Sequence, residues 1–218
     1  MSIRVALHHQ TTYRFARPAR VMPHVVRLRP APHSRTRIEA YSLTVTPPDH
    51  FLNWQQDPFG HSLARLVFPN PVEELSFTVD LVADMPAINP FDFFVEEYAE
   101  HAPFTYPEQL RRDLAPYLRP VGAHEDGTSA SIGQATGEPD AVDTWIADNV
   151  TARGLLDGTT GIVDFLVAVN GAMREAVDYT TRLEPGVQTP AQTLDRAIGS
   201  CRDSAWLLVS VLRRCGIA

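Results

Sequence analysis

The stretch GSCRDSAWLLVSVLRR, residues 199–214, decides how the C-terminal part of this chain folds. Its apolar residues recur at i, i+3, i+4 and i+7, which is the spacing of the buried stripe of a helix: Ala205, Leu208, Val209 and Leu212. Arg213 and Arg214 suit the last turn, where cations favour the negative end of the helix dipole, and Gly216 is a stop signal. We therefore predict an amphipathic helix that begins at Cys201.

The two cysteines differ in their places on this helix. Unpaired backbone N–H groups at a helix start stabilise a thiolate, the reactive form, so Cys201 is the candidate for reactivity. Cys215 lies at the opposite end, about 21 Å away along the axis, whereas a disulfide needs Cα atoms within about 7 Å. The helix therefore excludes a disulfide or a shared metal, and we expect Cys215 to be a small buried residue. On position alone, a cysteine such as Cys201 is more often structural than catalytic.

The sequence pattern of the N-terminal part predicts β-strands. Apolar and polar residues alternate in four runs, at 5–15, 41–45, 64–68 and 75–81, with Val5, Leu7, Tyr13 and Phe15 sharing one parity in the first. A period of two places the apolar side chains on one face of a half-buried sheet. Proline-rich and glycine-containing turns separate the runs. Short strands at this spacing predict an antiparallel β-sandwich.

The pattern changes near residue 86. Helical periodicity predicts helices at 107–118, 140–150 and 162–177, and the polar stretch 120–139 with its four glycines predicts a long loop. We therefore predict an α+β chain with three parts. They are a β-sandwich region (1–86), a connecting helix and loop (87–139), and a helical part (140–218).

Composition excludes several classes of function. All 19 basic residues are arginine, so no lysine can form a Schiff base or act as a general base. Residues 1–40 carry eight arginines and one acid, but the whole chain has a net charge of −7, which argues against nucleic-acid binding. The basic segment could equally meet the acidic remainder of the chain. HExxH, CxxC, GxxxxGK[ST] and GxGxxG motifs are absent, so we expect no metal and no cofactor.

The longest apolar runs have five residues, whereas a membrane span needs about 20. The first ten residues, MSIRVALHHQ, do not resemble a secretory signal. We therefore expect a cytoplasmic protein without a membrane partner.

Several motifs together resemble one family. The run G-x-C-R-D-x-A-x-L at 199–207, followed by LRRCGIA at 212–218, resembles the nucleophile helix of the bacterial transglutaminase-like superfamily, a family of cysteine-dependent hydrolases. Upstream of that helix, Tyr179 and Thr189-Pro190-Ala191 resemble the family's approach to its cysteine. Three further motifs are similar to the β-rich N-terminal region that accompanies this domain: HQTTY at 9–13, RLRP at 27–30 and DPFG at 57–60. Two positions depart from the family pattern: Ser200 replaces an apolar residue, and His61 stands where asparagine is common.

The resemblance implies a papain-like core with a Cys-His-Asp triad. Cys201 would attack the amide bond of a peptide or protein and form a thioester. The family's histidine and aspartate follow the cysteine helix, whereas all eight histidines here precede Cys201. We therefore expect residues 140–218 to be the N-terminal part of a catalytic core that is truncated after the nucleophile helix, and we expect the chain to be inactive alone. Asp203 lies about 200° around the helix from Cys201, which favours a capping role over a place in the triad.

One alternative remains open. The chain could be a non-enzymatic β-sandwich binding module with a degenerate transglutaminase-like domain. If it is an enzyme, hydrolysis and transamidation are equally consistent with the sequence, because both pass through the same thioester.

Overall fold

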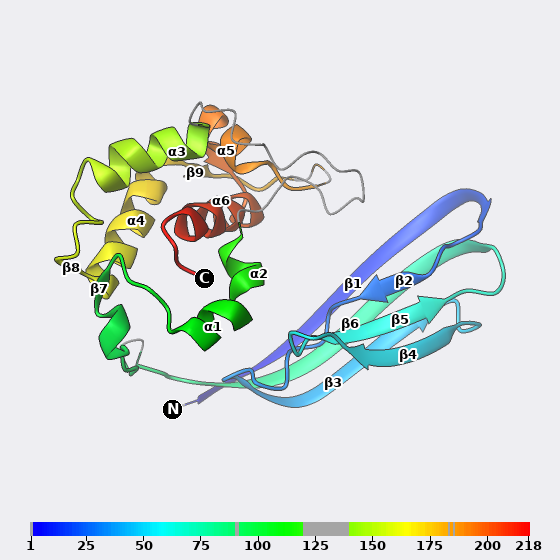
Figure 1. Cartoon of the computed structure of the whole chain (residues 1–218). Coiled ribbons are helices and arrows are strands. Elements are labelled where there is room, and N and C mark those ends of the chain that lie inside the picture. The colour runs from blue at the N-terminus through cyan, green and yellow to red at the C-terminus, as the bar shows by residue number, and fades with distance from the viewer. Residues whose placement is uncertain (1, 90–91, 120–139, 183, 185) are drawn as a thin grey trace. The chain divides into compact units, whose positions relative to one another are not determined.

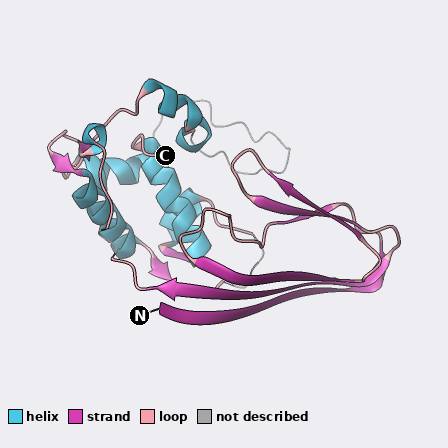
Figure 2. Cartoon of the chain, turned by 90° about the horizontal axis from the view of Figure 1, so that it is seen from below, coloured by secondary structure: helices cyan, strands magenta, loops and turns pink. Residues whose placement is uncertain are grey.

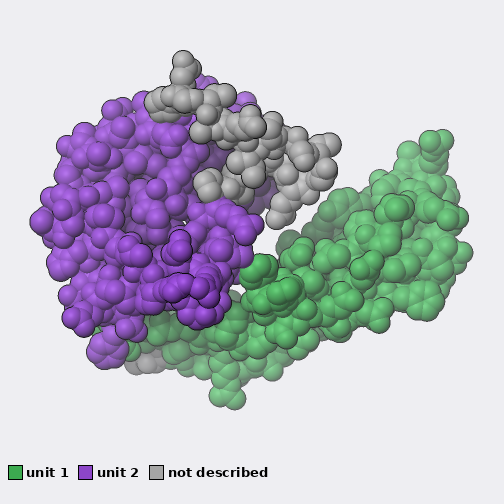
Figure 3. All heavy atoms as spheres, viewed as in Figure 1, with its two compact units in different colours: residues 1–93 green, residues 94–218 purple. Residues whose placement is uncertain are grey.

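The computed structural model describes residues 2–89, 92–119, 140–182, 184 and 186–218, so the loop expected at 120–139 lies outside the described residues. The chain divides into two compact units, 1–93 and 94–218 (Figures 1 and 3). Among the described residues, long strands occur only in the first unit, and helices dominate the second (Figure 2). The fold is therefore mixed α and β, with the strands first, as the sequence predicts.

Unit 1 is built from two three-stranded antiparallel sheets. The first has the order β1-β6-β3, with β1 at Ser2–Ala19, β6 at Val72–Pro86 and β3 at Arg37–Thr46. The second has the order β2-β5-β4, with β2 at His24–Val26, β5 at Ser62–Val67 and β4 at Phe51–Gln56. Both sheets contribute buried side chains to one core: Val26, Val45, Ala64, Leu66, Phe68, Val72, Leu75 and Phe77. The predicted sandwich is confirmed.

The apolar side chains of strand β1 are more exposed than the predicted half-buried sheet requires. Val5, Leu7 and Tyr13 are 36%, 49% and 51% exposed. Strand β1 has 18 residues, whereas the strands of the second sheet have only three to six, so within unit 1 they cannot cover its length. Strands β2 and β4 were not predicted, since neither alternates.

The DPFG motif forms the turn between β4 and β5. Gly60 has φ +85°, a left-handed conformation that favours glycine. The carboxylate of Asp57 accepts hydrogen bonds from the backbone N–H groups of Phe59 and His61, both at 2.9 Å. The imidazole Nδ1 of His61 lies 2.9 Å from the same carboxylate, so this side chain supports the turn in place of the family's asparagine.

Unit 2 contains six α-helices among its described residues. They are α1 (Glu108–Asp113), α2 (Ala115–Leu118), α3 (Ala141–Ile146), α4 (Ile162–Ala176), α5 (Pro190–Arg196) and α6 (Cys201–Arg214). A 3-10 turn, η1, spans Glu97–Ala99, and a π-helical turn, η2 at Ala147–Thr151, extends α3. Two pairs of two-residue strands complete the unit: β7 (His101–Ala102) with β8 (Thr160–Gly161), and β9 (Asp178–Tyr179) with β10 (Ile198–Gly199).

The predicted helix at 162–177 is confirmed as α4, and the one at 140–150 is confirmed as α3 with its π-helical extension. The predicted helix at 107–118 is instead two short helices, α1 and α2, separated at Leu114. Pro116 explains the break, because a proline within one continuous helix would clash with the carbonyl four residues earlier.

Helix α6 lies in the middle of unit 2, where it contacts α2, α3, α4 and α5 (Figure 1). Its buried face is centred on Leu207 and Val211, which pack with Phe165 and Val169 of α4. The predicted buried stripe is therefore wrong, because it lies on a different face of the helix: Ala205 is exposed, and Leu208, Val209 and Leu212 are only partly buried. Because other helices contact α6 on several sides, its apolar residues are not confined to one face, and their spacing does not show which face is most buried. No helix among the described residues has the length and apolarity that crossing a bilayer requires.

Candidate active site at the start of helix α6

The segment that leads into α6 is held by short, specific contacts. Strands β9 and β10 pair in parallel, and the N–H of Thr180 donates to the carbonyl of Gly199 at 2.9 Å. A Cβ on residue 199 would lie 3.1 Å from the Cβ of Asp203 and 3.2 Å from the Cγ2 of Thr193. Only glycine fits there without displacing its neighbours, which explains the first residue of the G-x-C-R-D motif.

Ser200 and Asp203 cap the helix. The backbone N–H and the hydroxyl of Ser200 both donate to Oδ2 of Asp203, each at 2.8 Å. Asp203 is completely buried, and Ser200 is 8% exposed. Ser200 and Asp203 thus form a capping box, in which the residue at the third helical position satisfies the N-cap donors. The predicted capping role of Asp203 is confirmed.

Two residues from the preceding loop complete the environment of Asp203. Arg182 donates through Nε to Oδ2 at 2.9 Å, and Gln188 donates through its backbone N–H to Oδ1 at 2.8 Å and through Nε2 to Oδ2 at 3.3 Å. Burial alone would raise the pKa of Asp203, but the hydrogen bonds from Ser200 and Gln188 outweigh it and hold the pKa well below the ordinary value. Asp203 is therefore a carboxylate at neutral pH.

Arg182 and Gln188 were not predicted as partners of Asp203. They lie 21 and 15 residues from Asp203 in a polar loop without periodicity. The sequence indicated such partners only indirectly, because a carboxylate in the first turn of a buried helix needs hydrogen-bond donors from elsewhere in the chain.

Cys201 is the first residue of α6, and its thiol is free and exposed. It lines a hollow of about 390 Å³ whose other walls include Asn170, Met173, Arg174, Tyr179, Ser204 and Leu208. Tyr179, which the sequence motifs placed upstream of the cysteine, thus lies beside the same hollow. None of the residues that line it is a histidine or a carboxylate.

Cys215 occupies the C-cap of the same helix and is partly buried. Burial raises the pKa of its thiol. The helix between the two cysteines is continuous, so the predicted separation of the two thiols is confirmed. Among the described residues, no group of three or more histidine, cysteine or acidic side chains could hold a metal ion.

Two family models match the chain. The bacterial transglutaminase-like N-terminal region matches residues 5–84, and the transglutaminase-like superfamily core matches residues 134–218. The C-terminal part of the chain, residues 134–218, therefore belongs to the transglutaminase-like superfamily. The superfamily core includes Cys201, Asp203 and every residue that contacts them in the network described above.

A solved structure has the same fold as this transglutaminase-like chain. It is a "putative cysteine protease" from Cytophaga hutchinsonii, with 16% sequence identity and a TM-score of 0.62. The match covers 99% of the present chain and 66% of the other, so the chain spans less than two thirds of that protein's length. No curated protein matches the chain.

Replacing Asp203 by Asn should destabilise the protein at neutral pH by about 3 kcal/mol, because Arg182 then loses its buried partner. The folded-state pKa of Asp203 is lowered, so its stabilisation is present above the unfolded value of about 3.9 and is lost as pH falls. The difference between wild type and Asp203→Asn should therefore shrink between about pH 5 and pH 2. Urea unfolding of both proteins at a series of pH values measures this difference in the free energy of unfolding.

The matched control is Asp195→Asn, which removes an exposed carboxylate from the neighbouring helix α5. It should change the free energy of unfolding by less than about 0.5 kcal/mol. Equal effects of the two substitutions at neutral pH would contradict the assigned role of Asp203.

Proposed function

We propose that Cys201 is the nucleophile of a transglutaminase-like cysteine hydrolase that acts on peptide or protein amide bonds. The observation that carries the proposal is the placement of an exposed, free thiol on the first residue of α6, at the edge of a hollow and within the matched superfamily core. The name of the structural neighbour, a cysteine protease, supports the same chemistry.

The reaction would proceed in two steps. The thiolate attacks the carbonyl carbon of the amide, the C–N bond breaks, and the amine leaves after taking up a proton, which leaves a thioester on Cys201. Water or a second amine then attacks the thioester and restores the thiol.

A general base has to reach Cys201 from outside its immediate surroundings. The residues lining the hollow include no histidine and no carboxylate, and Asp203 is fully engaged with Ser200, Gln188 and Arg182. We therefore propose that the triad's histidine and aspartate lie outside the described residues. Catalysis would require those residues, because a thiol without its base is weakly nucleophilic near neutral pH.

The same observation favours a second candidate, a binding protein with a catalytically degenerate core. In that case the β-sandwich of unit 1 would carry the function, and its aromatic side chain Trp54, 41% exposed, would contribute to a binding surface. Turnover by the natural gene product distinguishes the two candidates.

Iodoacetamide should modify Cys201 at least about tenfold faster than Cys215 near neutral pH, because Cys201 is exposed whereas burial raises the pKa of Cys215. Peptide mass spectrometry after timed labelling at several pH values gives both rates. A Cys215→Ala variant should leave the rate at Cys201 unchanged. Indistinguishable pH profiles for the two thiols would count against an accessible, reactive Cys201.

The natural gene product should release ammonia or amine from glutamine-containing peptides or from dipeptides, and Cys201→Ala should lower the rate about 10³-fold or more. The matched variant Cys215→Ala should keep most of the activity. Turnover that survives Cys201→Ala would refute the assigned nucleophile. No turnover by the natural gene product would favour the binding protein.

A further inference from the structure

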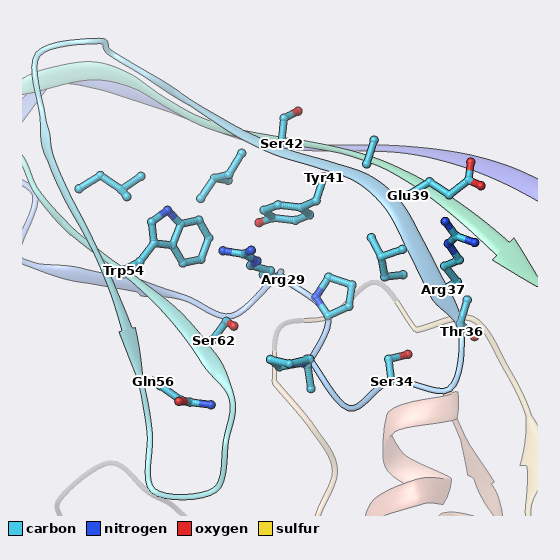
Figure 4. Close-up of a pocket in the computed structure, with 17 residues that line it drawn as sticks. Arg29, Ser34, Thr36, Arg37, Glu39, Tyr41, Ser42, Trp54, Gln56 and Ser62 are labelled. Atoms are coloured by element: carbon cyan, nitrogen blue, oxygen red, sulfur yellow. The ribbon is translucent and has the colours of Figure 1, made fainter.

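Unit 1 contains a cavity of about 860 Å³, more than twice the volume of the hollow at Cys201. It lies between β3, the edge strand of one sheet, and β4, the edge strand of the other, with the loop 29–36 forming a third wall (Figure 4). We call it the β3 cavity. Its volume falls within the range of about 300–1,000 Å³ that is typical of ligand sites.

An arginine and two aromatic rings form the centre of the β3 cavity. The Cζ atom of Arg29 lies 5.6 Å from the ring centroid of Tyr41 and 5.2 Å from that of Trp54. The rings themselves meet edge to face, with 6.2 Å between centroids (Figure 4). Stacking on aromatic faces orients a guanidinium while its in-plane N–H donors stay free for a carboxylate.

The charges in the β3 cavity are unbalanced. Among the described residues, neither Arg29 nor Arg37 has a carboxylate within ion-pair distance. Glu39, the one acid in the lining, pairs instead with Arg4 at 3.1 Å. The hydroxyl of Tyr41 is buried and lacks a hydrogen-bond partner in the described structure. Two arginines without a carboxylate partner among the described residues are complementary to an anionic ligand.

The backbone of β3 adds a second kind of recognition. Eight consecutive residues, 36–43, line the cavity, so the cavity follows the strand. One edge of β3 pairs with β6, and no described strand pairs with the other edge. The N–H and C=O groups of a free edge can bind an extended chain as an added strand.

We propose that the β3 cavity binds an extended acidic peptide, which pairs with β3 and places carboxylate side chains at Arg29 and Arg37. A peptide alone matches both the free backbone edge and the free arginines, whereas an acidic sugar or a nucleotide would use only the arginines. The site lies entirely within unit 1 and does not depend on the chemistry of Cys201.

Fluorescence anisotropy with the whole 218-residue chain tests the proposal. The probe is a fluorescein-labelled octapeptide of alternating valine or threonine and glutamate, and its control has glutamine in place of glutamate. The glutamate peptide should bind at least about tenfold more tightly, because charge-assisted hydrogen bonds to arginine are lost in the control. Methylating alternate backbone nitrogens of the glutamate peptide should also weaken binding about tenfold, since the strand pairing is then blocked.

Three variants assign the binding to this cavity. Arg29→Gln and Arg37→Gln should each weaken binding of the glutamate peptide about tenfold. Arg65→Gln, which changes an exposed arginine of β5 outside the cavity, should leave it unchanged. Both cavity arginines are exposed, so circular dichroism should show all three variants folded.

Equal affinity for the glutamate and glutamine peptides, or equal binding by Arg29→Gln, Arg37→Gln and Arg65→Gln, would overturn the proposal. Unchanged binding of the N-methylated peptide would overturn the strand pairing. Tighter, arginine-dependent binding of an oligogalacturonate would replace the peptide with an acidic saccharide.

Discussion

The buried carboxylate of Asp203 is the interaction on which the rest of unit 2 depends. It accepts five hydrogen bonds, from Arg182 and Gln188 in the loop before α5 and from Ser200 at the start of α6. A charge in this position costs several kcal/mol unless its partners are in place. The loop before α5, the turn at Gly199 and the start of α6 must therefore assemble together, and the position of Cys201 follows from that assembly.

The same carboxylate determines which way the thiol points. Leu207 and Val211 follow Asp203 at intervals of four residues, so all three lie on the buried face of α6. Cys201 precedes Asp203 by two residues and faces about 200° away from it, on the side of the hollow. The network thus buries Asp203 and leaves Cys201 exposed. The structure explains why a cysteine and an aspartate at this spacing can occur together without forming a catalytic pair.

Much of this arrangement was predictable from local sequence, but contacts between distant segments were not. The capping role of Asp203 and the exposure of Cys201 follow from positions within one helical turn. Arg182 and Gln188 approach from a loop whose path no periodicity encodes. The predicted buried face of α6 was wrong because several helices enclose it. The exposure of β1 depends on how short the opposing strands are. The β3 cavity arises where Arg29 of the loop after β2 meets Tyr41 of β3 and Trp54 of β4, a contact between distant residues that no periodicity indicates.

Acylation of the thiols by an activated p-nitrophenyl ester tests the central claim, that the Asp203 network places Cys201 for reaction. Intact-protein and peptide mass spectrometry would follow wild type, Asp203→Asn and Asp195→Asn at a temperature at which all three are folded. The account predicts a hydroxylamine-sensitive acyl group on Cys201, formed at least about tenfold more slowly in Asp203→Asn and at the wild-type rate in Asp195→Asn. Equal acylation of Cys201 and Cys215, or a rate at Cys201 that does not depend on Asp203, would contradict it.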